Sequence, residues 1–174
     1  DDLATEIFNK LSETLNKHSL YTEVETRVNG ILATKEGSTV PNIKTTATLD
    51  GSEFDITSLR GKYVMIDFWG LWCGPCMEEM PKVKEFQEKY KDKLAILGVN
   101  SGYTKERILE STKRNGYNWQ QILSVKGNSS DNFVNRFNVK GFPTKFILDP
   151  EGKIVKRYLG SGEDAFKLLE KLLD

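Results

Sequence analysis

The two cysteines of the chain, Cys73 and Cys76, are separated by only two residues. With no further cysteine in the sequence, each has only the other as a partner. The spacing lets the two sulfurs meet when the first cysteine caps a helix and the second lies in its first turn. A Cys-x-x-Cys between a strand and a helix is typical of a redox-active pair, and we predict that chemistry here.

The predicted helix gives the two sulfurs different tasks. A helix N-terminus presents unpaired N–H groups and the positive end of the helix dipole, and both favour a thiolate on Cys73. We therefore expect Cys73 to be the exposed attacking thiol and Cys76, one turn deeper, to be the resolving thiol. Pro75 suits the first turn because it has no N–H, and Gly74 allows a partner chain to approach closely.

Other uses of a cysteine pair fit this sequence less well. A disulfide that closes so short a loop constrains the unfolded chain little, so it would be a poor structural crosslink. A zinc site would need further ligands, and the only histidine, His18, lies in a distant N-terminal helix. Haem attachment requires a histidine directly after the second cysteine, where this chain has Met77. We predict no metal site.

Two carboxylates are candidates for proton transfer at the pair. Asp67 stands inside an apolar run, and a buried carboxylate has a raised pKa that would let it accept the proton of Cys76. The alternative is an edge or strand-end aspartate that faces solvent. Glu79 falls on the same helical face as Cys76, although Glu78 and Glu79 could instead form a solvated helix turn. Between the two candidates, we favour Asp67.

The elements that must position these residues can be read from the hydrophobic pattern. Residues 62–69 predict a central strand buried on both faces, and 73–90 predict a helix kinked at Pro81. A tight hairpin is predicted where Asp50-Gly51 joins strands at 45–49 and 53–56. Further strands are expected at 94–100, 119–123, 144–148 and 154–158, and helices at 104–115, 130–137 and 163–172. This order predicts an α/β fold with a mixed sheet covered on both faces.

The first 39 residues differ from the main domain, which we assign to 40–174. Leu3, Ile7, Leu11 and Leu15 recur every four residues and predict an amphipathic helix over about 3–17. The pattern of 20–32 fits strand or helix, and we favour helix; 35–41 has the composition of a linker. Residues 1–39 could be the end of an upstream domain, or could dock such a domain or a second copy of the chain.

The bulk composition narrows the function classes. The chain has 174 residues, with 25 Lys plus Arg against 25 Asp plus Glu, so it carries no basic footprint for nucleic acid. No apolar run approaches the roughly 20 residues that cross a bilayer. Because the sequence begins at Asp1 rather than Met, we expect it to be a piece of a longer precursor, in which a targeting segment or membrane anchor would precede it.

Two motifs resemble those of a known family. Asp67-Phe68-Trp69-x-x-Trp72-Cys73-Gly74-Pro75-Cys76 resembles the active-site stretch of thioredoxins, and Gly141-Phe142-Pro143-Thr144 resembles their second signature loop. The early hairpin, Glu78-Glu79-Met80-Pro81 and the insertion over 94–137 are similar to the TlpA and ResA type of bacterial extracytoplasmic thiol reductase. The resemblance covers 40–174. It implies a thioredoxin-like three-layer fold with an N-terminal hairpin, a central insertion and an extra N-terminal helical segment.

The resemblance also implies a substrate surface around the cysteine pair, formed by Trp72, Gly74, Pro75, Phe142 and Pro143. Pro143 would be a cis proline facing the pair, leaving the Phe142 backbone free for strand-like pairing with a substrate. Asp67 matches the thioredoxin pattern, whereas Glu79 matches the ResA pattern. Trp69 and Trp119 are expected to pack in the core.

The activity implied is thiol–disulfide exchange, in the direction of protein-disulfide reduction, with no cofactor beyond the dithiol itself. The substrates would be disulfide-containing proteins, and cytochrome c apoprotein, a misoxidised envelope protein and a dedicated partner are all compatible with the sequence. An unidentified thiol protein would supply electrons. The location implied is the bacterial periplasm or cell envelope rather than the cytoplasm. Two alternatives stay open: a peroxiredoxin-like antioxidant, whose Pro-x-x-x-Thr-x-x-Cys site this chain lacks, and a binding module that delivers metal or haem through the same cysteines.

Overall fold

The computed structural model describes residues 6–7, 9–10, 21–127 and 129–174. At its centre is a five-stranded mixed sheet in the order β5-β4-β3-β6-β7. The bounds are β3 Tyr63–Trp69, β4 Leu94–Asn100, β5 Gln120–Leu123, β6 Thr144–Leu148 and β7 Ile154–Leu159. Strands β3, β4 and β5 run parallel, whereas β6 and β7 join antiparallel. The predicted mixed sheet is confirmed.

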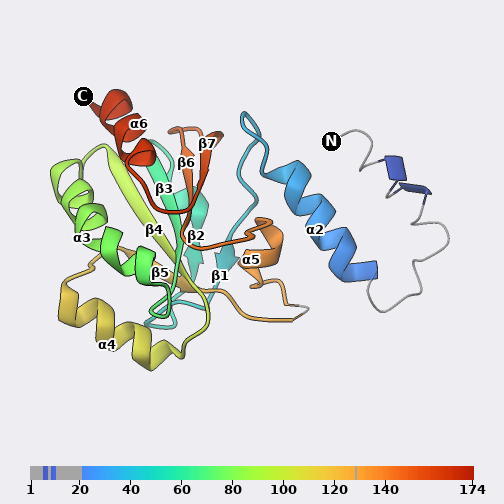
Figure 1. The fold of residues 1–174 in the computed structure, drawn as a ribbon, viewed down its shortest axis with the longest axis horizontal. Coiled ribbons are helices and arrows are strands. Elements are labelled where there is room, and N and C mark those ends of the chain that lie inside the picture. Colours follow the sequence, from blue (N-terminus) through green and yellow to red (C-terminus); the bar gives the residue numbers. More distant parts are fainter. Residues whose placement is uncertain (1–5, 8, 11–20, 128) are drawn as a thin grey trace.

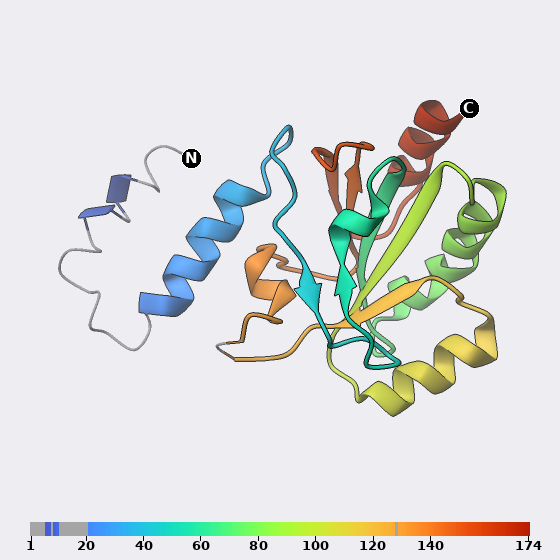
Figure 2. The ribbon, with the colours of Figure 1, turned by 180° about the vertical axis from the view of Figure 1, so that it is seen from behind.

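Helices cover both faces of this sheet, as Figure 1 and the reverse view in Figure 2 show. Helices α3, α4 and α6 lie on one face, with bounds Gly74–Lys89, Lys105–Asn115 and Asp164–Leu173. The other face is covered by α5 and by the small hairpin of β1 and β2, which is followed by the 3-10 helix η1. Their bounds are Phe133–Arg136, Lys44–Thr45, Phe54–Asp55 and Ile56–Leu59. Helix α2, Tyr21–Ala33, lies outside α5. This is the expected three-layer α/β fold.

Strand β3 divides its side chains between two apolar clusters. Met65 and Trp69 belong to the cluster under α3 and α6, whereas Ile66 and Phe68 belong to the cluster under the hairpin and α5. Because side chains alternate along a strand, Asp67 shares the face of Met65 and Trp69 and points toward α3. The sequence therefore places one acidic side chain in the core, on the side of the cysteine pair.

Helix α3 begins at the first cysteine, as predicted. Cys73 is its N-cap residue with an extended backbone, and Pro75 lies in the first turn. The helix includes Pro81 and continues to Lys89. Helix α4 also begins as predicted, after Thr104.

The hairpin before β3 pairs as expected, but it does not have the predicted tight turn. Only the two-residue strands β1 and β2 pair, and residues 46–53 connect them. Within this connection, Thr48 forms a bridge with Ile122 of β5, which attaches the loop to the sheet edge. Hydrogen bonds from the Ser52 hydroxyl and N–H, and from the Thr48 hydroxyl, lower the pKa of Asp50 to about 2. Asp50-Gly51 therefore forms a local turn inside a longer loop.

The predicted linker at 35–41 is bonded to the domain. The N–H groups of Gly37 and Val40 donate to the carbonyls of Ile154 and Gly152, at 2.7 and 3.0 Å. The Val40 side chain is buried in the core. The composition of the segment suggested a loop, but the free edge of the sheet beside β7 supplies backbone partners that local composition cannot reveal.

The predicted helix over 130–137 is shorter than expected. Helix α5 begins after Asn132, whose side-chain oxygen accepts from the N–H of Asn135. A second bond from the Asn132 amide to the Gly127 carbonyl, at 2.7 Å, fixes the cap in place. Because one asparagine satisfies both the helix and the loop before it, the helix begins there.

Residues 20–32 were predicted to be helical, and α2 confirms this. Helix α2 packs against α5. Of the helix predicted at 3–17, the structure describes only 6–7 and 9–10, and these residues are helical. The rest of that range and His18 lie outside the described residues. Within the described part of the chain, no helix is long and apolar enough to cross a membrane.

Candidate active site

Cys73 and Cys76 form a disulfide at the start of α3, with an S–S distance of 2.03 Å. The Cys76 N–H donates to the Cys73 sulfur at 3.2 Å, so the cysteine itself acts as the helix cap. The Cys73 N–H is directed the other way, to the Gly70 carbonyl at 3.0 Å. The first sulfur thus lies at the unpaired N–H groups of the helix, where a thiolate would be stabilised.

The prediction of an exposed Cys73 is wrong for the disulfide form. Cys73 is 4% exposed and Cys76 is 3% exposed, and both belong to the apolar cluster under α3. As a cap residue, Cys73 folds its side chain back over the first turn, where its sulfur is bonded to Cys76. The surface at this point is formed instead by Trp72, Gly74 and Pro75, which are exposed.

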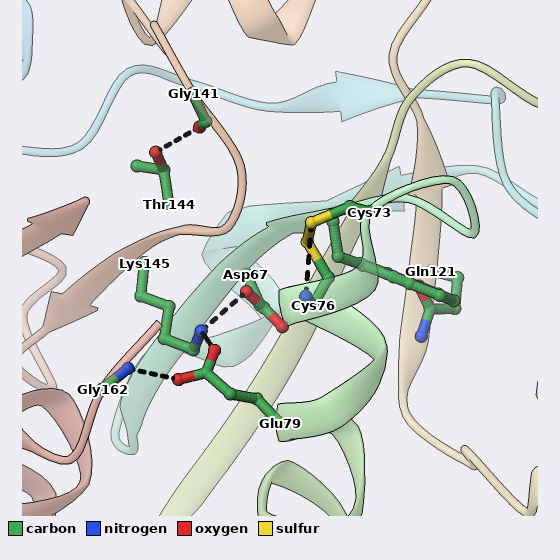
Figure 3. Close-up of polar contacts among 10 residues, drawn as sticks. Asp67, Cys73, Cys76, Glu79, Gln121, Gly141, Thr144, Lys145 and Gly162 are labelled. Carbon is green, nitrogen blue, oxygen red and sulfur yellow. Dashed lines mark hydrogen bonds and ion pairs between the residues drawn. A yellow bond between two sulfur atoms is a disulfide. The ribbon is translucent and has the colours of Figure 1, made fainter. Parts of the chain in front are cut away.

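Asp67 is buried beneath the cysteine pair, as predicted, and not at a solvated strand end. It is 3% exposed and lies on the strand face that α3 covers. Burial raises the pKa of Asp67, the positive charge of Lys145 partly opposes that rise, and the negative charge of Glu79 adds to it. In Figure 3 the Asp67 carboxylate lies between the Lys145 ammonium and the disulfide.

A lysine completes the site, and our reading of the sequence missed it. Lys145 on β6 is the direct cross-strand partner of Asp67 on β3. Its ammonium nitrogen lies 3.5 Å from Asp67 Oδ1 and 2.5 Å from Glu79 Oε2. The Lys145 side chain is only 2% exposed. A lysine within the apolar run of 144–148 signals a buried carboxylate partner, because a buried charge is very costly unless paired.

Glu79 belongs to the site, whereas Glu78 faces solvent. One Glu79 oxygen accepts from Lys145, and the other accepts from the Gly162 N–H at 2.7 Å, in the loop before α6. Its side chain is 13% exposed. The solvated-turn interpretation is therefore correct for Glu78 and wrong for Glu79 (Figure 3).

The second signature loop is held by β6 and β7. The Phe142–Pro143 peptide bond is cis, as the resemblance implied. Thr144 donates its hydroxyl hydrogen to the Gly141 carbonyl at 2.7 Å, and the Gly160 N–H donates to the Pro143 carbonyl at 2.8 Å. Phe142 makes no backbone hydrogen bond to another described residue.

The three tryptophans divide as predicted between surface and core. Trp72 is 52% exposed, donates to the Ser101 carbonyl at 2.8 Å, and meets the Phe142 ring edge-on at a centroid distance of 5.0 Å. It therefore joins the cysteine loop to the signature loop. Trp69 is fully buried, with its indole N–H on the side-chain oxygen of Gln121 at 3.0 Å. Trp119 is buried as well.

Comparison with known proteins agrees with this geometry. The Redoxin family matches residues 35–173, which is most of the chain. The chain belongs to the Redoxin family. Among curated members, the thiol-disulfide oxidoreductase ResA of Geobacillus kaustophilus is 32% identical over 158 residues, covering 89% of this chain and 86% of that protein. ResA of Bacillus subtilis is 33% identical, covering 72% of this chain and 68% of that protein.

Solved structures show the same fold. The thioredoxin domain of a thiol-disulfide oxidoreductase from Bacteroides vulgatus is 29% identical, with a TM-score of 0.70, covering 80% of this chain and 99% of that one. A thiol:disulfide interchange protein from a Bacteroides species is also 29% identical, with a TM-score of 0.69, covering 81% and 91%. This Redoxin-family chain is thus a ResA-like thiol-disulfide oxidoreductase with a thioredoxin-like fold.

Proposed function

We propose that this oxidoreductase works as a reductant of protein disulfides outside the cytoplasm. The observation that carries the proposal is the Cys73–Cys76 disulfide at the N-terminus of α3, with a buried carboxylate, Asp67, beneath it. Such a pair has a sulfur placed for attack, a second sulfur for release, and an acceptor for the second proton.

The proposed reaction uses each group once. The reduced Cys73 thiolate attacks one sulfur of the substrate disulfide, and the other substrate sulfur leaves as a thiolate with the bonding electron pair. Cys76 then loses its proton to Asp67 and attacks the Cys73 sulfur of the mixed disulfide. This forms the intramolecular disulfide and releases the second substrate thiolate. The substrate gains two electrons, and the protein pair is oxidised.

Apart from the N-terminus of α3, the described residues place few groups where they would stabilise a reduced pair, and this supports reduction as the direction of exchange. Strong oxidants such as DsbA, at about −120 mV, owe that potential to a stabilised reduced form, whereas thioredoxin lies near −270 mV. Here, among the described residues, Cys73 Sγ accepts one hydrogen bond, from the Cys76 N–H. The acidic group below the pair, Asp67, disfavours nearby negative charge. Both features support a reductant.

We propose that the substrate docks across the gap between the two signature loops. The exposed Trp72 ring and the Phe142 ring would contact substrate side chains, and Gly74 and Pro75 would leave room for its backbone. Apart from its chain neighbours and the backbone of its own helix, no atom of the described residues lies within 4 Å of the position that a Cβ on Gly74 would occupy. The Phe142 backbone beside cis Pro143 would pair with an extended substrate segment.

The remaining parts of the proposal rest on the family resemblance. The protein would act in the periplasm or cell envelope, and a separate thiol protein would return electrons to its disulfide. Apocytochrome c, during cytochrome c biogenesis, is one substrate of suitable chemistry, because its haem-binding cysteines must be reduced before haem attachment.

Insulin reduction coupled to a chemical dithiol, together with the equilibrium potential measured in glutathione or dithiothreitol buffers, tests the direction. We expect the wild type to reduce insulin and to show a potential near −270 mV. Cys73→Ser should abolish reduction, and Lys82→Met, at a half-buried position of α3 outside the proposed site, should leave it unchanged. A potential close to about −120 mV, or insulin reduction that persists in Cys73→Ser, would contradict the proposal.

A further inference from the structure

Lys145 lies between two carboxylates that come from different elements. Its ammonium is 2.5 Å from Glu79 of α3 and 3.5 Å from Asp67 of β3. The side chains of Lys145, Asp67 and Glu79 are 2%, 5% and 13% exposed. At these burial levels the charges are weakly screened, so a change in any one of them is felt strongly by the other two.

The two carboxylates are not equivalent. Glu79 has two donors, the Lys145 ammonium and the Gly162 N–H, one on each oxygen. Asp67 Oδ1 is buried without a hydrogen bond, and its contact with Lys145 is longer. Hydrogen bonds to a carboxylate favour its charged form, whereas burial favours its protonated form. A proton arriving at this cluster would therefore go to Asp67.

We propose that Lys145 is the positioning residue that sets the charge state of Asp67, and that Glu79 is the anchor that holds Lys145 in place. The inference deepens the proposed function, since it rests on Asp67 as the acceptor of the Cys76 proton. It also assigns different roles to the two carboxylates that the sequence left as rival acceptors.

Lys145 and Glu79 act at different stages of the proton transfer in the release step. Before transfer, the Lys145 cation keeps Asp67 ionised despite burial, so that Asp67 can accept. The Cys76 proton then moves to Asp67, and the Cys76 sulfur uses the freed electron pair to bond with the Cys73 sulfur. The bond between Cys73 and the substrate sulfur breaks in the same step, and that substrate sulfur leaves as a thiolate with the bonding electron pair. After transfer, Glu79 still balances the Lys145 charge. Without Glu79, a neutral Asp67 would leave that cation with no buried partner.

The charged and titratable groups near Asp67 come from the elements packed around it. Helix α3 contributes Cys73, Cys76 and Glu79, and strand β6 contributes Lys145. On β7, Tyr158 stands opposite Lys145 in register, and between α3 and α6 lies the ion pair of Lys82 with Glu163. The β4 residue opposite Asp67 is Gly98, which carries no charge. Among the described residues, Lys145 is the one cation that forms an ion pair with Asp67, whereas the Lys82 ammonium pairs with Glu163.

A purely structural lysine would predict different behaviour. If Lys145 only held β6 against α3, removing it would lower stability and slow exchange equally at every pH. If it sets the charge state of Asp67, removing it moves the pH dependence itself. Removing Glu79 should then move that dependence in the opposite direction, because its negative charge opposes ionisation of Asp67.

The test compares Lys145→Met, Glu79→Gln and the control Lys82→Met. The Asp67 side-chain carboxyl is followed by carbon-13 NMR against pH in the disulfide form, so the measurement does not require activity. We expect Lys145→Met to move the Asp67 titration up by about one pH unit or more, and Glu79→Gln to move it down. Lys82→Met should leave it in place. Release of substrate from Cys73 should slow about tenfold in Lys145→Met below the wild-type midpoint.

Lys145→Arg keeps the charge and should restore the wild-type profile. If Lys145→Met does not fold, the double variant Lys145→Met/Glu79→Gln removes one charge of each sign, and its Asp67 titration should still lie above that of Glu79→Gln alone. The inference is overturned if the Asp67 titration is unmoved by loss of Lys145, or if Lys145→Met and Glu79→Gln move it in the same direction. A protein that shows both shifts but reduces no disulfide would reject the proposed function and not this coupling.

Discussion

At the scale of single residues, the proposed proton transfer needs an ionised Asp67 carboxylate, but an ionised carboxylate in the core destabilises the folded protein. Asp67 is buried beneath the redox pair, and burial raises its pKa above the ordinary value of 3.8. The folded protein therefore holds the proton more tightly than the unfolded chain does. The stability that this proton provides is present at acidic pH and is lost as pH rises from about 3.8 through the raised value.

The raised pKa of Asp67 gives the first prediction. Asp67→Asn should stabilise the protein at pH 7 to 8, because the variant never places a negative charge in the core. The gain should be about 1.4 kcal/mol for each unit by which the pKa is raised, and it should vanish near pH 3. Urea denaturation at several pH values measures it.

The matched control is Asp50→Asn. Hydrogen bonds from Ser52 and Thr48 lower the pKa of Asp50 to about 2, so loss of that carboxylate should bring no gain at neutral pH. The prediction is contradicted if both substitutions stabilise the protein equally, or if Asp67→Asn lowers its stability. Either result would mean that burial does not destabilise the ionised Asp67 carboxylate.

The cysteine pair and the acceptor could be identified from residue types alone. Cys73, Cys76 and Asp67 were found because cysteines are few and because a carboxylate is unusual within an apolar strand. Lys145 was missed because its partner lies far away in sequence. Only the pairing of β3 with β6 brings the two together. The burial of Cys73 was also missed, because a motif gives no information on how the side chain folds over the helix start.

At the scale of elements, the strands and helices that carry strong periodic or continuous apolar patterns were predictable. Strand β4 has the predicted bounds, and α3 and α4 begin where their caps were expected. The errors fall where tertiary partners decide the structure. The hairpin loop is attached to β5, the segment at 35–41 is bonded beside β7, and the start of α5 is set by Asn132.

Helix α2 supplies the second prediction. A Cβ on Gly30 would lie 2.7 Å from the Arg136 carbonyl oxygen and 2.9 Å from that of Asn135, both backbone atoms of α5. Gly30→Ala should therefore push α2 off α5 and destabilise their contact by about 1–3 kcal/mol, more than the roughly 1 kcal/mol that alanine gains in helix propensity. Limited proteolysis of α2 and thermal unfolding measure the effect.

Asn29→Ala is the control at the neighbouring exposed position of α2. This substitution gains the higher helix propensity of alanine without placing a methyl group against α5. Gly30→Ala with unchanged protease resistance and a raised melting temperature would show that α2 does not pack closely on the domain. Insulin reduction should be retained in both variants, since neither residue belongs to the active site.

At the scale of the whole molecule, two apolar clusters on opposite faces of one sheet hold the site. The cluster under α3 and α6 contains the cysteines and surrounds the ion pairs, whereas the other cluster supports β3 and β6 from behind. The fold class was predictable because strands and helices alternate along the chain. The distances between the site residues could not be predicted, because they depend on the register of strands that are far apart in sequence.

The third prediction concerns the redox state of the folded protein. Reduction creates a thiolate and a thiol above the buried Asp67. Among the described residues, one hydrogen-bond donor, the Cys76 N–H, contacts Cys73 Sγ. We expect the disulfide form to melt at a higher temperature than the dithiol form. Calorimetry of both forms, with a phosphine reductant for the dithiol, measures the difference. A more stable dithiol form would indicate a stabilised thiolate and hence an oxidant.

The central claim is that Cys73 attacks and Cys76 releases, and trapping the mixed disulfide tests it most directly. The reduced Cys76→Ser and Cys73→Ser variants are each mixed with a peptide that contains one disulfide, and the products are mapped by mass spectrometry. We predict that Cys76→Ser accumulates a stable adduct on Cys73, the N-cap residue of α3, and that Cys73→Ser forms little or none at Cys76, which lies inside the helix. An adduct that forms equally well on Cys76, or no adduct on either cysteine, would contradict the account.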